Sequence, residues 1–162
     1  MTPDKRAAFI AQYGGIYEHS PWVAETLFDQ GPANAPLDNI GPMAAIVEGA
    51  SHELQMTLLC AHPELAGKLA KSGALTDEST SEQANAGLDQ CSEKEFEEFT
   101  SLNTKYRATF GFPYILAVRG RNRHEILDNF RARVANDTAT EFREALNQVH
   151  QIARLRLEML SL

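Results

Sequence analysis

Two short segments carry residue types suited to proton transfer on a small polar substrate. His62 directly precedes Pro63, and the polar run Ser79-Thr80-Ser81-Glu82-Gln83 follows later in the chain. An imidazole has an unperturbed pKa of about 6.5, so His62 can exchange a proton near neutral pH. A carboxylate beside a carboxamide can accept and donate hydrogen bonds, which suits the N–H edge of a ring or ureido compound. The pattern indicates acid/base chemistry on such a substrate.

A third candidate lies at the end of an apolar run that resists helix formation. Pro113 biases Phe112 toward extended backbone, and the residues that follow, up to Arg119, are apolar and partly β-branched. We expect an extended segment that crosses the interior of a helical bundle. Its buried N–H and C=O groups then need hydrogen-bond partners, and a ligand is a natural candidate.

Each candidate also has an explanation without function. A histidine at a helix C-terminus and an acid at a helix N-terminus are both favoured by the helix dipole, and Arg119 has the pattern of a surface arginine. We expect His19, His124 and His150 to be surface residues. His52 and His62 are ten residues apart and no paired Cys/His spacing occurs, so we expect no metal site. Motifs of elbow serine hydrolases, P-loop enzymes and Rossmann dehydrogenases are absent from the sequence.

Helix signals dominate the elements that must position these residues. Ser92 with Glu95 reads as a capping box with Gly111 at the helix end, and Thr138 with Glu141 reads as a second capping box. Ser20 reads as a third helix cap. We predict an all-α, single-domain bundle over residues 1–162 with the extended FGFP segment inside it, near the active site. The predicted helices cover about residues 3–13, 21–30, 43–50, 52–60, 64–71, 81–90, 93–110, 122–134 and 138 to the end.

Composition narrows the classes of partner. A chain of 162 residues that is 43% hydrophobic can fill one core, and its net charge of −7 argues against nucleic acid or anionic membranes. Cys60 and Cys91 stand apart without a CxxC motif, which indicates reduced, buried thiols. The N-terminal residues lack the apolar run of a signal peptide, and no stretch reaches the length of a membrane span. We therefore expect a cytoplasmic protein.

Read together, three stretches resemble one enzyme family. AHPELAGKLA, LTDESTSEQANAGLDQCS and FEEFTSLNTKYRATFGFPYILAVRGRNRHEIL are similar, in order and spacing, to the 2-oxo-4-hydroxy-4-carboxy-5-ureidoimidazoline (OHCU) decarboxylases. The resemblance runs from about Gly15 to the C-terminal helix. It implies an all-α, often dimeric carboxy-lyase that needs no cofactor and converts its anionic ureidoimidazoline substrate to (S)-allantoin in urate degradation. A homodimer is therefore expected.

The resemblance also implies roles for particular residues. His62 occupies the position of the catalytic histidine and Pro63 that of its substrate-contacting neighbour, while Ser79 through Gln83 fall on the polar binding stretch. The family's other binding segment, which lends backbone groups and an arginine, maps onto Ile115, Leu116, Ala117, Val118 and Arg119. We expect Arg119 to hold a carbonyl oxygen of the ring or ureido group. We also expect Glu82 to repel the substrate carboxylate before it leaves as CO₂.

Two other interpretations of the same residues stay open. In the first, the chain is a helical ligand-binding or interaction module without catalysis, with His62 as a helix end and the FGFP segment as core packing. In the second, it is a decarboxylase of a related ureido or heterocyclic acid, because motifs do not define the scope of a pocket.

Overall fold

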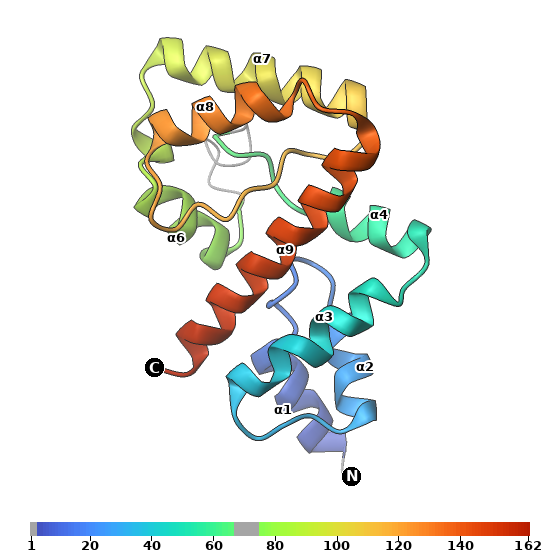
Figure 1. The fold of residues 1–162 in the computed structure, drawn as a ribbon. Coiled ribbons are helices and arrows are strands. Elements are labelled where there is room, and N and C mark those ends of the chain that lie inside the picture. The colour runs from blue at the N-terminus through green and yellow to red at the C-terminus, as the bar shows by residue number, and fades with distance from the viewer. Residues whose placement is uncertain (1–2, 67–74) are drawn as a thin grey trace. The chain divides into compact units, whose positions relative to one another are not determined.

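The computed structural model describes residues 3–66 and 75–162. Over these residues the regular structure is helical, without strands, which confirms the all-α class (Figure 1). The chain divides into two compact units, one made of Met1–His62 with Gln148–Leu162 and the other of Pro63–Asn147. The single domain expected over residues 1–162 stays a prediction.

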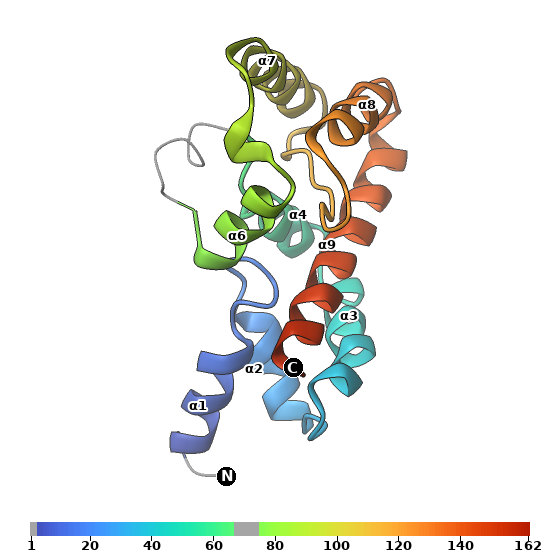
Figure 2. The same cartoon turned by 90° about the vertical axis from the view of Figure 1, so that its left-hand side faces the viewer.

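The first unit holds the N-terminal helices. Its α2 packs against both α1 and α3 (Figures 1 and 2), and its core includes Val23, Val47 and Leu58, all fully buried. Ser51 caps α4 by accepting a hydrogen bond from the Leu54 amide. The elements are α1 (Pro3–Tyr13), α2 (Trp22–Gln30), the 3₁₀ helix η1 (Pro36–Asn39), α3 (Ile40–Glu48) and α4 (His52–Cys60), together with the later part of α9 (Thr138–Leu160).

Two predictions about this unit are wrong. Pro21 is the N-terminal cap residue of α2, and the Ser20 hydroxyl donates to the Glu18 carbonyl instead of capping the helix. His150 is half-buried: its Nδ1 lies 2.8 Å from the Tyr17 hydroxyl and its Nε2 lies 3.0 Å from Glu48. The partner of Ser20 is only two residues away, whereas the partners of His150 reach it only in the folded chain.

The second unit is organised around a buried aromatic cluster. Tyr106 of α7 packs against Phe112, Tyr114 and Phe130, and the Tyr114 ring stacks on Phe130 with centroids 3.8 Å apart. Helices α7 and α8 lie side by side (Figures 1 and 2). The elements are α6 (Asp77–Asn85), the 3₁₀ helix η2 (Leu88–Gln90), α7 (Glu93–Phe110), α8 (Arg123–Arg133) and the start of α9.

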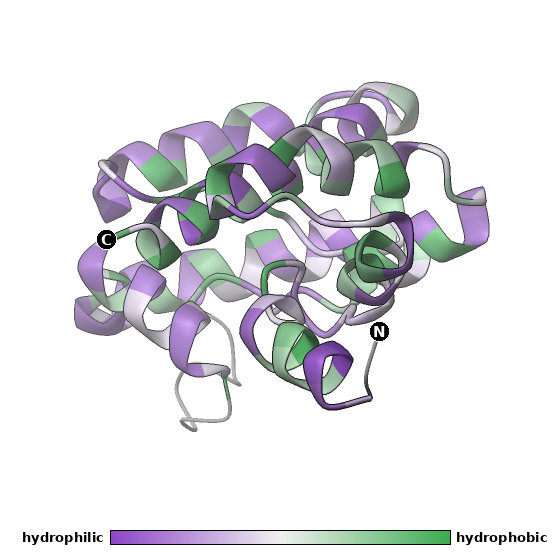
Figure 3. Ribbon diagram, turned by 90° about the horizontal axis from the view of Figure 1, so that it is seen from below, coloured by the Kyte–Doolittle hydropathy of each residue, from purple (hydrophilic) through white to green (hydrophobic). Residues whose placement is uncertain are grey.

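The helices carry both apolar and polar residues, as amphipathic helices do (Figure 3). The predicted start and end of α7 are confirmed. The side chain of Ser92 accepts from the Glu95 amide while Glu95 accepts from the Ser92 amide. Gly111 follows with φ 82°, a left-handed conformation that glycine adopts without strain. Residues 112–118 come next; they are buried and form no regular structure.

Three other predictions need correction. The helix expected at residues 81–90 begins at Asp77, because Thr76 caps it. Of the helix expected at 64–71, residues 64–66 are not helical, and 67–71 lie outside the described residues. Glu141 does not complete a capping box: Asp137 accepts from the Thr140 amide at the start of α9, and the Glu141 carboxylate is fully buried elsewhere.

The two cysteines and the apolar content of the helices bear on two further predictions. Cys60 and Cys91 form no disulfide and are half-buried, so the expectation that they are buried is wrong. Within residues 3–66 and 75–162, the structure contains no helix that is both long and apolar enough to cross a membrane.

Candidate active site

His62 lies just beyond α4 in the first unit, where the helix has ended. Ala61 caps the helix, and the His62 amide donates to the Leu59 carbonyl at 3.2 Å. The residue is only 7% exposed, and its Nε2 atom has no hydrogen-bond partner within the described part of the chain. Buried polar atoms are nearly always paired. An unpaired imidazole nitrogen is therefore able to take a hydrogen bond or proton from a ligand.

The surroundings of His62 favour its neutral form. Burial lowers the pKa of His62 to about 4, the carboxylate of Glu18 opposes this shift, and electrostatic interactions with Arg156 and His19 add to it. At neutral pH the imidazole is therefore uncharged and able to act as a base.

Glu18 and Arg156 form a buried ion pair in the same unit. The Arg156 Nη2 donates to Glu18 Oε2 at 2.6 Å, and Nη1 donates to the Gly15 carbonyl at 3.0 Å. The two side chains are 1% and 7% exposed, respectively. The pair thus presents two opposite charges whose fields both reach His62.

Reasoning from the sequence missed both of these residues. One readable signal existed for Arg156: it follows Ile152 by four residues and Ala153 by three, so it lies on the buried face of α9. A charge on a buried helix face indicates a paired or functional residue. Glu18 carries no comparable local signal.

In the second unit, Gln83 fixes the turn that follows Pro63. Its Oε1 accepts from the Ala66 amide at 3.0 Å, and its Nε2 donates to the Glu64 carbonyl at 3.4 Å. Asn103 holds the same turn by donating to the Leu65 carbonyl at 3.0 Å. Ala66 has φ 51°, which costs energy for a residue with a Cβ, so these bonds maintain a strained turn.

The polar stretch of α6 divides into a buried and an exposed face. Ser79 and Gln83 are one helical turn apart and buried, Glu82 is half-buried, and Thr80 and Ser81 are exposed. The expectation that Glu82 lies at a helix N-terminus is wrong, since α6 begins at Asp77. Gln83 already uses both ends of its amide, although its oxygen retains a second lone pair.

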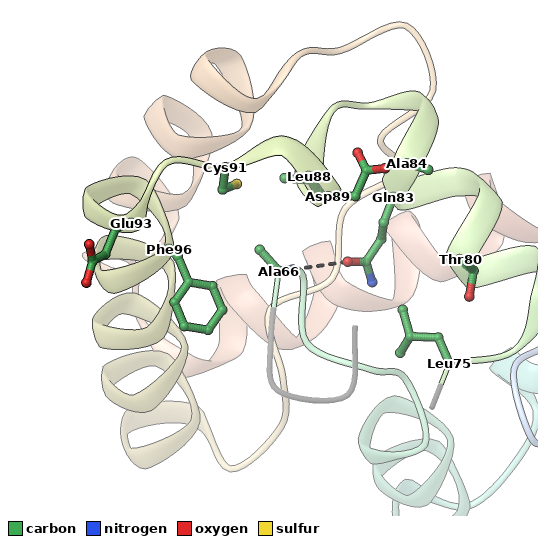
Figure 4. Close-up of a pocket in the computed structure, with 10 residues that line it drawn as sticks. All are labelled: Ala66, Leu75, Thr80, Gln83, Ala84, Leu88, Asp89, Cys91, Glu93 and Phe96. Carbon is green, nitrogen blue, oxygen red and sulfur yellow. Dashed lines mark hydrogen bonds between the residues drawn. The ribbon is translucent and has the colours of Figure 1, made fainter. Parts of the chain in front are cut away.

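A cavity of about 640 Å³ opens beside Gln83 (Figure 4). Figure 4 shows the Gln83 side chain directed at Ala66, with Thr80 and Leu75 on one side of it and Cys91 and Phe96 on the other. Asp89 and Glu93 add two carboxylates to the lining. Burial raises the pKa of Cys91, which keeps this thiol protonated at neutral pH.

The segment after Pro113 has internal hydrogen-bond partners for some of its buried backbone groups and not for others. Arg133 Nη1 donates to the Ile115 carbonyl at 2.6 Å, and the Arg121 amide donates to the Val118 carbonyl at 3.0 Å. The amides of Ile115, Leu116 and Val118 make no hydrogen bond to the described residues, although these residues are 3–5% exposed. Internal partners thus satisfy carbonyls of the segment and leave amide donors available for a ligand.

Arg119 and Pro63 are the remaining predicted site residues. Arg119 is exposed at the end of the buried run, and Pro63 is half-buried. Among the residues that the structure describes, no three His, Cys, Asp or Glu side chains are grouped to hold a metal ion.

Comparison with known proteins supplies the family. The family model described as OHCU decarboxylase matches residues 4–158. The chain is 43% identical over 150 residues to a 2-oxo-4-hydroxy-4-carboxy-5-ureidoimidazoline decarboxylase of Haloferax volcanii, covering 93% of this chain and 87% of that one. It is 41% identical over 144 residues to the uric acid degradation bifunctional protein PucL of Bacillus subtilis, covering 89% of this chain but 28% of that longer protein.

Solved structures agree with this match. A crystal structure of (S)-allantoin synthase superposes with a TM-score of 0.73 at 37% identity, covering 95% of this chain and 50% of that one. A crystal structure of OHCU decarboxylase in the presence of (S)-allantoin has a TM-score of 0.74 at 22% identity, covering 91% and 96% of the two chains, and so supports the fold. From its sequence match over nearly the whole length, the chain belongs to the OHCU decarboxylase family.

Proposed function

We propose that this protein catalyses the cofactor-independent decarboxylation of 2-oxo-4-hydroxy-4-carboxy-5-ureidoimidazoline to (S)-allantoin in urate degradation. The observation that carries the proposal is His62, a buried imidazole whose Nε2 is unpaired and whose pKa lies near 4, in a chain of the decarboxylase family. We further propose that residues 1–162 act as one decarboxylase-like domain, in the cytoplasm and as a homodimer. Those three points rest on the family resemblance and on composition.

The proposed reaction needs one group that first accepts and then donates a proton. Neutral His62 takes the proton of the substrate hydroxyl through Nε2. Loss of CO₂ then leaves an electron pair on the ring carbon, which delocalises into the neighbouring unsaturation. The carbon that lost CO₂ becomes a carbonyl, and the ring nitrogen that receives the negative charge takes a proton from water. The imidazolium delivers its proton to the neighbouring ureido-bearing carbon from one face, which gives a single enantiomer and restores neutral His62.

Glu18 and Arg156 suit the two halves of this proton cycle. The Glu18 carboxylate raises the pKa of His62, so it stabilises the imidazolium that forms in the first step. Burial and Arg156 lower the same pKa, so the imidazolium remains a strong enough acid to protonate carbon. Because these effects on the His62 pKa oppose each other, His62 can both accept the proton and release it again.

The remaining residues bind and orient the substrate in this proposal. Pro63, Ser79, Thr80, Ser81, Glu82 and Gln83 contact it, with Glu82 and Gln83 at its N–H edge. The backbone of Ile115, Leu116, Ala117 and Val118 contributes amide donors to its carbonyl oxygens. The amides of Ile115, Leu116 and Val118, which make no hydrogen bond to the described residues, support this role. Arg119 meets a carbonyl oxygen as negative charge develops on it, which is where a cation lowers the barrier.

The decisive test generates the unstable substrate from urate in situ and follows optically active allantoin by circular dichroism. We expect the protein to accelerate its formation, and His62→Gln to reduce kcat by about 10²- to 10⁴-fold. His52→Gln, which removes an exposed histidine of α4, is the matched control. A folded protein that gives no acceleration over the spontaneous reaction would refute the proposed function.

The role of Glu82 is tested separately. If Glu82 repels the substrate carboxylate before CO₂ leaves, Glu82→Gln should lower kcat. If that substitution raises KM alone and leaves kcat intact, Glu82 only orients the substrate and the repulsion hypothesis is wrong.

A further inference from the structure

We propose that Arg133 is a positioning residue that fixes the peptide between Ile115 and Leu116 so that the Leu116 N–H is presented to the substrate. The inference rests on the proposed function, in which this segment binds substrate. Nothing in the sequence pattern singled out Arg133, which lies at the last residue of α8.

Arg133 is bound to the segment in two ways. Its Nη1 donates to the Ile115 carbonyl at 2.6 Å, and its guanidinium carbon lies 4.6 Å from the centroid of the Tyr114 ring. The Tyr114 ring is itself held in place, because it stacks on Phe130 with an interplanar angle of 8°. The arginine is 5% exposed, so these interactions are little screened by water.

The orientation of Arg133 is itself determined by buried partners. Its Nε donates to Glu141 Oε1 at 2.9 Å, and the Tyr106 hydroxyl donates to the same oxygen at 2.6 Å. Asn136 donates to the other carboxylate oxygen at 3.0 Å. Glu141 is fully buried. The planar guanidinium is therefore held in one plane, with Nη1 directed at the Ile115 carbonyl.

The geometry of a trans peptide converts this contact into a second constraint. The C=O of Ile115 and the N–H of Leu116 belong to one planar group and point in opposite directions, and the chain has no cis peptide bond among its described residues. Holding the carbonyl toward Arg133 therefore directs the Leu116 N–H away from it. That amide is in a residue only 3% exposed and makes no hydrogen bond to the described chain.

Stability alone is a weak reason for this arrangement. A buried ion pair is often no more stabilising than apolar side chains of similar volume, because both charges lose their hydration. The Arg133–Glu141 pair is better explained by the bond that Nη1 of Arg133 makes, which gives the Ile115 carbonyl a single orientation. The donor on the other side of the peptide is then oriented before substrate arrives.

The test compares Arg133→Lys with a matched variant of the same helix. Lysine retains the positive charge beside Glu141 but lacks the fork that reaches Glu141 and Ile115 together. We expect KM to rise about tenfold with kcat within twofold, since an amide donor binds the ground state and the transition state alike. The control is Ile126→Val, fully buried on α8, which should lower the melting temperature without changing KM.

A second measurement does not depend on activity. Amide hydrogen exchange at Leu116 should become faster in Arg133→Lys than in wild type and remain unchanged in Ile126→Val. A KM for Arg133→Lys equal to that of the control, in an active enzyme, would overturn the inference and leave the proposed function intact. A folded wild type without decarboxylase activity would instead refute the proposed function. If Arg133→Lys does not fold, the double variant Arg133→Met/Glu141→Leu, which removes both charges, takes its place.

Discussion

The depressed pKa of His62 predicts how the stability of the protein depends on pH. The pKa is about 4 in the folded chain and about 6.5 for an unfolded histidine. Because the folded value is the lower one, the unfolded chain binds more protons between these two pH values. The free energy of unfolding therefore falls as the pH drops through this window. Integration of the linkage relation gives a loss of about 2 kcal/mol from His62 between pH 8 and pH 5.

Urea unfolding of wild type and His62→Gln at pH 8 and pH 5 measures this contribution. Glutamine does not titrate, so the variant should lose about 2 kcal/mol less than wild type on acidification. Other titrating groups contribute to both proteins and cancel in the comparison. His52→Gln controls for the loss of one imidazole from the chain.

Catalysis should report the same pKa. If neutral His62 is the base, kcat/KM should stay level as the pH falls from 7 to 5 and decline with an apparent pKa of about 4.

In the urea experiment, equal losses of stability in wild type and His62→Gln between pH 8 and pH 5 would refute the reasoning. That result would mean that the folded protein protonates His62 as readily as the unfolded chain.

Four further predictions concern the two units separately. Glu18→Gln removes the charge that raises the His62 pKa, so an NMR titration should place that pKa below its wild-type value, and an increase would contradict the assignment. Arg156→Met leaves Glu18 buried without its partner and should cost about 3–5 kcal/mol in urea unfolding; a loss under about 1 kcal/mol would show that the carboxylate is rehydrated. Phe130→Ala should cost a similar 3–5 kcal/mol by removing the ring that stacks on Tyr114, whereas Ser92→Ala should cost only about 1 kcal/mol through loss of the α7 cap.

Local signals in the sequence were enough where one short segment determines the outcome. The Ser92–Glu95 capping box and Gly111 fix both ends of α7 within a few residues of themselves, and both were predicted correctly. The break before His62 is likewise local, because Pro63 excludes helical backbone for the residue that precedes it. The start of α6 was missed because several hydroxyl residues competed as caps, and Thr76 is the one that takes the role.

Long-range pairing could not be predicted from the same signals. Glu18 and Arg156 are 138 residues apart, and no local pattern specifies that they meet. Glu141 was misread for a related reason: its position fits a capping box, but the buried guanidinium of Arg133 and the hydroxyl of Tyr106 compete for its carboxylate. Solvation decides the competition, since a buried arginine needs an anion far more than an exposed helix end needs a cap.

The division of the chain into two units gives one of them an optical reporter of its own. The single tryptophan of the chain is Trp22, in α2 of the first unit, so its fluorescence follows the unfolding of that unit alone. Tyr106 and Tyr114 of the second unit contribute to near-ultraviolet circular dichroism together with the buried Tyr13 and Tyr17 of the first, so this signal follows both units. Coincident transitions in tryptophan fluorescence and tyrosine dichroism would indicate one cooperative domain, and separated transitions would indicate two.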